Sequence, residues 1–139
     1  MKDRDFLDTN ILVYAFDSSN TRKQDRAAGL LAEAIRNETA LLSTQVLGEF
    51  FTIVTRKISQ PLQPKQALEV LESVSVLPVL EVDLEMVRRA IRTSDRYRIS
   101  YWDSLIIAAA ERGGCTRLLS EDLNSGQCFY DIVVYNPFA

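Results

Sequence analysis

Histidine is absent from this 139-residue chain, and cysteine occurs only twice. Without histidine, the chain cannot carry out Ser-His-Asp or Cys-His catalysis, or acid–base catalysis by imidazole. Cys115 and Cys128 cannot build a disulfide framework, and they lack the spacing and the histidine partners of a zinc site. We expect both to be small buried thiols in a reducing compartment. Hydrolytic chemistry would therefore depend on carboxylates, hydroxyls, lysine, tyrosine or a metal ion.

Long apolar runs are also missing. The longest, 11–16 and 105–110, are too short to cross a bilayer, and the N-terminal segment Met1–Asp5 lacks the apolar core of a signal peptide. We therefore expect a cytoplasmic protein without a membrane partner. Excess positive charge is missing as well, because the net charge is −3. This argues against a general nucleic-acid coat, although a bound cation would reverse the charge of an acidic site.

Short apolar segments alternate with helical patterns along the chain, with no repeat or linker between them. We expect one domain over 1–139. The predicted strands are 5–8, 39–42, 79–82, 117–119 and 132–134. The predicted helices are a short one through Leu12 and Tyr14, then 25–36, one from an N-cap at Ser43 to about 57, 64–73, 84–97 and 101–112. This order predicts a three-layer α/β/α sandwich around a central parallel sheet, whose ligands lie beyond the carboxyl ends of the strands.

Four acidic residues occupy positions at which a cation site is expected. Asp8 ends the first predicted strand and Asp122 follows the fourth, so both fall at the ligand-binding edge of the sheet. Asp103 shares a helical face with Ile106, Ile107 and Ala110.

Glu49 likewise shares a helical face with Val46, Phe50 and Ile53. Burying an unpaired carboxylate costs several kcal/mol or shifts its pKa, and no nearby lysine or arginine shares these two faces. A shared hard cation such as Mg²⁺ or Mn²⁺ would stabilise these carboxylates.

Each acid also has a purely structural interpretation. Asp8 or Thr9 could cap a helix, and Asp103 could pair with Ser100 at a helix start. Asp122 could belong to an ordinary turn.

Four segments carry these acids within longer motifs: 6–15 (FLDTNILVYA), 42–50 (LSTQVLGEF), 100–106 (SYWDSLI) and 119–123 (LSEDL). Taken together and in this order, they resemble the four motifs of the PIN-domain nucleases, with a particular similarity to the VapC-type toxins of prokaryotic toxin–antitoxin pairs. The similarity extends from the first strand to Asn136-Pro137-Phe138.

The resemblance implies an endoribonuclease that depends on Mg²⁺ or Mn²⁺ and hydrolyses RNA with a metal-activated water, leaving 5′-phosphate and 3′-hydroxyl ends. It also implies a homodimer held inactive by a cognate antitoxin protein. It assigns the catalytic and metal-binding roles to Asp8, Glu49, Asp103 and Asp122. Their neighbours in the site would be Thr9, Asn10 and Ser120.

Phosphates that enter an acidic pocket need basic residues at its rim. Arg88, Arg92 and Arg96 recur every four residues in the predicted helix 84–97; they are candidates to contact RNA at this rim, or they form a solvated helix face. A smaller cluster with the same two interpretations consists of Arg22, Lys23 and Arg26. Tyr101 and Trp102 could stack on a base, or Trp102 could belong to the core or a dimer interface.

Two other functions would use the same acids. A phosphatase of the haloacid-dehalogenase type would use Asp8 as its nucleophile, but it requires a second Asp where Asn10 stands. It also requires a later active-site lysine, and none follows Lys65. A non-catalytic binding module could use the acids as a regulatory Mg²⁺ site.

Overall fold

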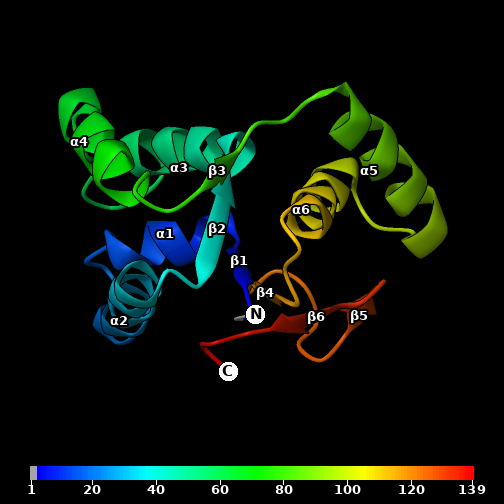
Figure 1. Ribbon diagram of the computed structural model, residues 1–139. Helices are drawn as coiled ribbons and strands as arrows, with labels where there is room; N and C mark the ends of the chain where they lie inside the picture. Colours follow the sequence, from blue (N-terminus) through cyan, green and yellow to red (C-terminus); the bar gives the residue numbers. More distant parts are fainter. Residues whose placement is uncertain (1–2) are drawn as a thin grey trace.

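Six strands form one sheet in the order β3-β2-β1-β4-β6-β5 (Figure 1). The computed structural model describes residues 3–139, so Met1 and Lys2 of the N-terminal segment discussed above lie outside the described residues. The strands are β1 (Asp5–Leu7), β2 (Ala40–Ser43), β3 (Val79–Leu80), β4 (Arg117–Leu119), β5 (Cys128–Phe129) and β6 (Ile132–Tyr135). Neighbouring strands pair in parallel except β5 and β6, which are antiparallel.

Six helices cover the two faces of this sheet among the described residues. They are α1 (Thr9–Ala15), α2 (Thr21–Asn37), α3 (Thr44–Arg56), α4 (Pro64–Val74), α5 (Leu84–Tyr97) and α6 (Tyr101–Arg112). Figure 1 shows α1 to α4 on one side of the sheet and α5 and α6 on the other. The predicted α/β/α sandwich is therefore confirmed, with one antiparallel strand at its edge.

Polar caps set where the helices begin. The side chains of Asp8, Asn20, Ser43, Asp83 and Ser100 each accept a hydrogen bond from a backbone N–H in the first turn of their helix. Helix α4 begins instead at Pro64, whose fixed φ suits a first helical turn. The cap at Asn20 starts α2 at Thr21, four residues earlier than predicted.

The chain reverses its direction of travel across the sheet between β1 and β4. From β1 it proceeds to β2 and β3, and it then returns to β4 on the opposite side of β1. The backbone N–H of Asp8, just after β1, donates to the carbonyl of Leu119 at the end of β4 (3.0 Å). In open α/β sheets a crevice forms at such a reversal, beyond the carboxyl ends of the strands.

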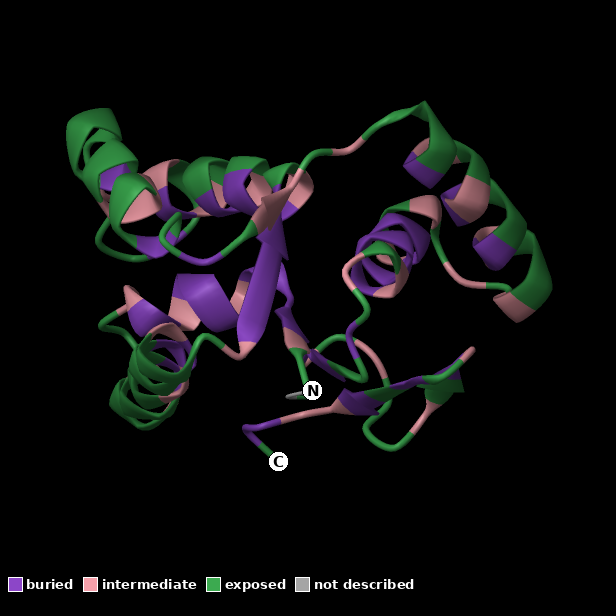
Figure 2. Cartoon of the chain, in the orientation of Figure 1, coloured by how far each residue is buried: buried purple, intermediate pink, exposed green. Residues whose placement is uncertain are grey.

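The core is richest around α6, which has seven consecutive buried residues, 104–110. Figure 2 shows this helix and the central strands buried, while the outer surfaces of α2, α4 and α5 are exposed. Helix α6 is buried on all sides because it packs between the sheet and α5. It therefore fixes the position of Asp103, which lies in its first turn, relative to the strands.

The two cysteines differ in their surroundings. Cys115 is buried, and burial raises the pKa of its thiol to about 12. Cys128 is exposed, so the expectation that both thiols are buried was wrong for this residue. It lies on β5, a two-residue edge strand that the sequence pattern did not reveal, because a run this short shows no alternation.

Among residues 3–139, no helix is both long and apolar enough to span a membrane.

Candidate active site

A pocket of about 400 Å³ opens beyond the carboxyl ends of β1 and β4, where the connection reverses. We call it the acidic pocket because its charged lining consists of five carboxylates and one amine. These residues are Asp8, Asp17, Glu49, Asp103, Asp122 and Lys57. The structure thus brings all four predicted acids into one pocket, together with Thr9 and Asn10.

Asp8 is the most deeply buried of the four acids, with 6% of its surface exposed. It caps α1 by accepting a hydrogen bond from the Thr9 N–H (2.7 Å), and it accepts a second from the Ser120 hydroxyl (2.7 Å). Burial raises the pKa of the Asp8 carboxyl to about 6, against these two hydrogen bonds. The negative charges of Asp122 and Glu49 raise this pKa further. The chain therefore holds a carboxylate here that a nearby cation would stabilise.

Glu49 is half-buried and is held by two donors. The Thr9 hydroxyl donates to its Oε2 (2.9 Å), and the Gln45 side-chain amide donates to its Oε1 (2.8 Å). The same amide also donates to the carbonyl of Trp102 (3.1 Å), which ties α3 to the first turn of α6. With both hydrogens of Gln45 used in this way, its buried Oε1 has no hydrogen-bond partner among the described residues.

Asp103 and Asp122 complete the group. Burial raises the pKa of the Asp103 carboxyl, and the charges of Asp122 and Glu49 raise it further, although Ser100 lowers it. Asp122 is exposed and accepts a hydrogen bond from the Asn10 amide (3.1 Å), while its backbone N–H donates to the Ser120 hydroxyl (3.1 Å). None of the ion pairs between described residues involves one of the four acids.

This donor set suits a hard divalent cation. Four carboxylates without a basic partner repel one another, and oxygen ligands favour Mg²⁺ or Mn²⁺ over zinc. Within residues 3–139 no three acidic side chains lie close enough together to enclose one ion. Mg²⁺ is commonly held by one or two carboxylates and keeps several waters. The unpaired Oε1 of Gln45 is an acceptor of the kind that such a water requires.

The burial of the acids differs from what their helical faces indicated. Asp103 and Glu49 are only half-buried, whereas Asp8 is buried. In α6 nearly every face is apolar, so sharing a face with Ile106 and Ile107 did not distinguish Asp103 from a residue at any other position on that helix. The structural interpretation of Asp8 as a cap is confirmed, and it is compatible with a second role because only one lone pair is used by Thr9.

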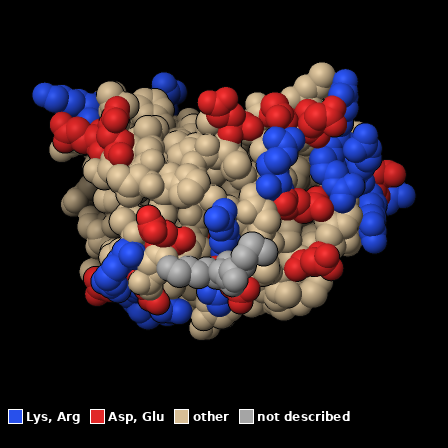
Figure 3. Space-filling view, in the orientation of Figure 1, with Lys and Arg blue, Asp and Glu red and all other residues tan. Residues whose placement is uncertain are grey.

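The arginines of α5 do not line the acidic pocket. Helix α5 packs on the far side of α6, and Figure 3 shows Lys and Arg side chains gathered over it. Arg88 pairs with Glu85, and the Arg96 guanidinium lies over the Tyr130 ring (5.0 Å). Arg92 lines a separate recess between α5 and α6. The structure therefore separates Arg88, Arg92 and Arg96 from the acids with which they were grouped.

The basic cluster of α2 holds the C-terminal segment in place. Arg22 donates to the carbonyl of Phe138 (3.4 Å), and Arg26 donates to the carbonyl of Pro137 (3.2 Å). Lys23 pairs with Glu121 at 2.5 Å, next to Asp122. Hydrogen bonds from Lys23 and Tyr14 lower the pKa of Glu121, although burial opposes this. These contacts brace the loop after β4 on which Asp122 lies.

Sequence reasoning missed four polar residues of the pocket: Tyr14, Asp17, Gln45 and Lys57. Gln45 and Lys57 belong to a row spaced by four residues along α3 and its C-cap, whose members all line the acidic pocket: Gln45, Glu49, Ile53 and Lys57. The i, i+4 spacing from Glu49 was visible in the sequence and could have identified the row.

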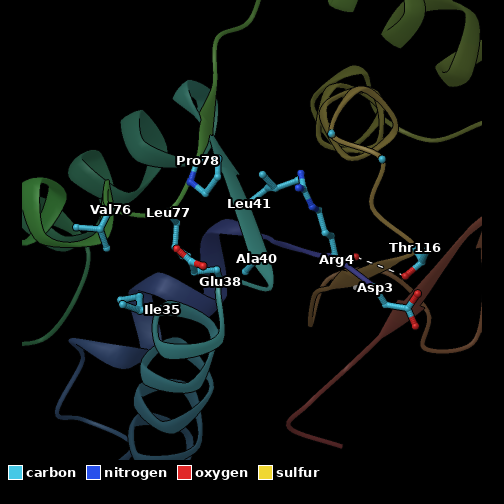
Figure 4. Close-up of a pocket in the computed structure, with 12 residues that line it drawn as sticks. Asp3, Arg4, Ile35, Glu38, Ala40, Leu41, Val76, Leu77, Pro78 and Thr116 are labelled. Carbon is cyan, nitrogen blue, oxygen red and sulfur yellow. Dashed lines mark hydrogen bonds between the residues drawn. The ribbon is translucent and has the colours of Figure 1, made fainter. Parts of the chain in front are cut away.

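A larger cavity lies elsewhere, at the amino ends of the strands (Figure 4). This amino-edge cavity of about 1000 Å³ is lined by residues that precede β1 to β4, among them Arg4, Glu38, Pro78 and Thr116. Its charged residues are of both signs, and it holds no group of acids like that of the acidic pocket. The acidic pocket is therefore chosen as the candidate site for its arrangement of acids and not for its volume.

Fold and site together define a doubly wound α/β protein with an acidic site where its strand order reverses. The chain belongs to the PIN domain family, whose sequence model matches residues 6–128. The predicted PIN-domain membership is thereby confirmed. No curated protein sequence matches the chain.

Solved structures share this fold at low sequence identity. The VapC20 toxin of Mycobacterium tuberculosis, described as cleaving the sarcin–ricin loop, is 20% identical with a TM-score of 0.68, over 85% of this chain and 89% of that one. VapBC2 of Rickettsia felis, bound to promoter DNA, is 20% identical with a TM-score of 0.69, over 95% and 97%. DNA-bound VapBC of Salmonella typhimurium is 17% identical with a TM-score of 0.69, over 98% and 99%.

Proposed function

We propose that this protein is a divalent-metal-dependent endoribonuclease and the toxin of a toxin–antitoxin pair. The observation that carries the proposal is the convergence of Asp8, Glu49, Asp103 and Asp122 on one pocket without a basic partner. The shared fold with the VapC20 toxin supports the choice of RNA as the substrate.

Asp8, Asp103 and Asp122 would hold Mg²⁺ or Mn²⁺, directly or through water, with Glu49 completing the acidic pocket. When bound, such an ion stabilises negative charge on a phosphodiester and lowers the pKa of water. The hydrogen bonds of the chain orient the carboxylates of the site. The Ser120 hydroxyl links Asp8 to the backbone of Asp122, and Thr9 links the start of α1 to Glu49. These hydrogen bonds fix the carboxylates before any ligand arrives, so that little reorganisation accompanies binding.

Asn10 favours this function over a strand-end phosphatase. Its amide nitrogen donates to Asp122 and its amide oxygen accepts from the backbone N–H of Glu121 (3.3 Å). Both ends of the side chain therefore hold the loop after β4. An amide in this position cannot serve as the general acid that the phosphatase mechanism requires there.

An antitoxin protein is the proposed partner. Solved structures with this fold include a toxin–antitoxin complex from Klebsiella pneumoniae, 16% identical with a TM-score of 0.68, over 95% of this chain and 96% of that one. A basic or amphipathic segment would complement the acidic pocket. We also propose a homodimer and a cytoplasmic location, in keeping with this function.

The test is to incubate the purified protein with total cellular RNA and to map the new ends. We expect 5′-phosphate ends to appear with Mg²⁺ or Mn²⁺ and to be absent with EDTA. RNA that stays intact at every Mg²⁺ and Mn²⁺ concentration would favour the non-catalytic binding module instead. Cleavage that persists in EDTA would contradict the metal dependence.

A further inference from the structure

The acidic pocket presents a problem to an RNA strand, because its five carboxylates repel phosphates. A bound divalent ion would offset part of this charge, yet the strand must extend past the ion on both sides. The basic residues predicted for this task lie on α5, away from the pocket. The strand must therefore meet a different cation at the pocket itself.

Lys57 is the one basic side chain among the described residues that line the acidic pocket. It is exposed, and none of the ion pairs or hydrogen bonds of the described residues uses its amine. The other nearby lysine, Lys23, is already held by Glu121 and Tyr14. Lys57 is thus available to a ligand, whereas the neighbouring cation is not.

The row of α3 places Lys57 at a useful distance from the acids. Lys57, the C-cap residue of α3, follows Glu49 by eight residues, which corresponds to about 12 Å along the helix axis. This spacing places Lys57 at the end of the row farthest from Gln45, which donates to Glu49. Lys57 is therefore suited to a phosphate next to the one at the acids.

Trp102 lies at the other end of the pocket, beside Asp103. Its side chain is 64% exposed, which is unusual for so large an apolar group. Its backbone is fixed by the hydrogen bond from Gln45, and its ring meets Tyr101 edge-on at 4.9 Å. An exposed aromatic ring held in place at the rim of a phosphodiesterase pocket is suited to stacking on an unpaired base.

We infer that single-stranded RNA lies along α3 across the acidic pocket, with a phosphate on Lys57 at one end and a base on Trp102 at the other. The inference rests on the proposed function, since it describes how the same site takes its substrate. The salt bridge to one phosphate and the stacking on one base leave different experimental signatures. The first depends on salt concentration, and the second does not.

The experiment measures binding of a fluorescent, mixed-sequence single-stranded RNA with Ca²⁺ as the divalent ion, over a series of KCl concentrations, with a gel to show that the RNA stays intact. We compare Lys57→Gln with Arg56→Gln. Both variants remove one exposed positive charge from the end of α3, but Arg56 does not line the pocket. Lys57→Gln is expected to weaken binding about tenfold and to flatten the slope of log affinity against log salt by about 0.7, the value for one phosphate on a single strand. Arg56→Gln should bind like the wild type, and Lys57→Arg should restore the slope.

Trp102→Leu tests the other end. It should weaken binding at every salt concentration by a similar factor and leave the slope unchanged, while Trp102→Phe should retain most of the affinity. Equal slopes for Lys57→Gln and Arg56→Gln would overturn the inference, and so would a wild-type protein that does not bind the RNA. Binding that depends on Lys57 and Trp102 without any cleavage in Mg²⁺ or Mn²⁺ would overturn the proposed function and leave this inference standing.

Discussion

The cavities at the two ends of the sheet differ in volume, in charge and in how closely the surrounding residues pack. At the carboxyl ends of the strands, a pocket of about 400 Å³ gathers five acids. At the amino ends, a cavity of about 1000 Å³ has charges of both signs, and Gly113 approaches Leu41 closely there. The smaller pocket carries the candidate chemistry because helix starts and loops meet where β1 and β4 end. The candidate site therefore follows the reversal of strand order and not the larger cavity volume.

The largest expected effect is the loss of RNA cleavage when an aspartate is replaced at the carboxyl end of the sheet and not at the amino end. Asp8→Asn should lower RNA cleavage by a factor on the order of 10³, since it removes a charge that would hold the metal ion. Asp3→Asn is the matched control, because Asp3 lines the amino-edge cavity and the substitution is the same. Initial rates on a labelled RNA in Mg²⁺ measure both. Comparable losses in the two variants would erase the distinction between the two ends.

The Asp8→Asn substitution that lowers RNA cleavage should raise the free energy of unfolding. Its pKa is about 6 in the fold against an ordinary value of 3.8, so burying the ionised form opposes folding. The cost is absent below pH 3.8, grows as the pH rises and is complete above about 6, where it reaches about 3 kcal/mol.

Without divalent ions, Asp8→Asn is therefore expected to exceed the wild type in free energy of unfolding by up to about 3 kcal/mol at pH 7.5 and to match it at pH 4. Asparagine also caps helices, so α1 keeps its start. Urea unfolding at both pH values provides the measurement. A variant less stable than the wild type at pH 7.5 would contradict the expected burial cost.

Packing at the amino ends can be tested with two glycines. A Cβ at Gly113 would lie 2.6 Å from Leu41 Cδ1 and 3.2 Å from Leu80 Cδ1, and Leu41 is buried. Gly113→Ala should therefore lower the free energy of unfolding by about 2 kcal/mol. Gly48→Ala is the control on α3: nothing lies within 4 Å of its Cβ, so it should stabilise the helix by about 1 kcal/mol. Thermal unfolding of both variants would reveal the opposite signs; equal shifts would show that Leu41 moves aside.

The smallest effect is expected at α5. Arg92→Gln should change RNA cleavage by less than about twofold, because Arg92 lines a recess that includes none of the carboxylates of the acidic pocket. Lys57→Gln is the natural comparison in the same assay. A loss at Arg92 as large as that at Lys57 would place RNA on α5 after all.

Local patterns predicted much of this fold. Helices α5 and α6 and strand β4 begin and end at the predicted residues, because caps at Asp83 and Ser100 and the pair Gly113-Gly114 are local features. The early part of α2 was missed, since the segment after its Asn20 cap is polar and shows no apolar repeat. Strand β5 was missed because it exists only through its pairing with β6.

At the candidate site, local sequence patterns did not predict how deeply each acid is buried or which way the α5 arginines face. The motifs and the strand ends predicted that the four acids would lie together. Their burial depends on contacts between elements that are distant in the sequence, and the pattern of a single helix does not contain this information. Asp8 is buried at the junction of β1 and α1, where it accepts hydrogen bonds from Thr9 of α1 and from Ser120 in the loop after β4. Likewise, the α5 arginines form a real stripe, yet the packing of α5 against the outer side of α6 turns it away from the pocket.

The burial of helix α6 predicts which substitutions would inactivate the protein. Its seven consecutive buried residues, 104–110, follow directly after Asp103, so almost any polar or larger replacement in that stretch would displace the carboxylate or unfold the chain. Selection for inactive alleles should therefore recover changes in this helix alongside changes at the acids themselves. The tolerant positions should fall on the solvent-facing sides of α2 and α4, where many residues have few neighbours to disturb.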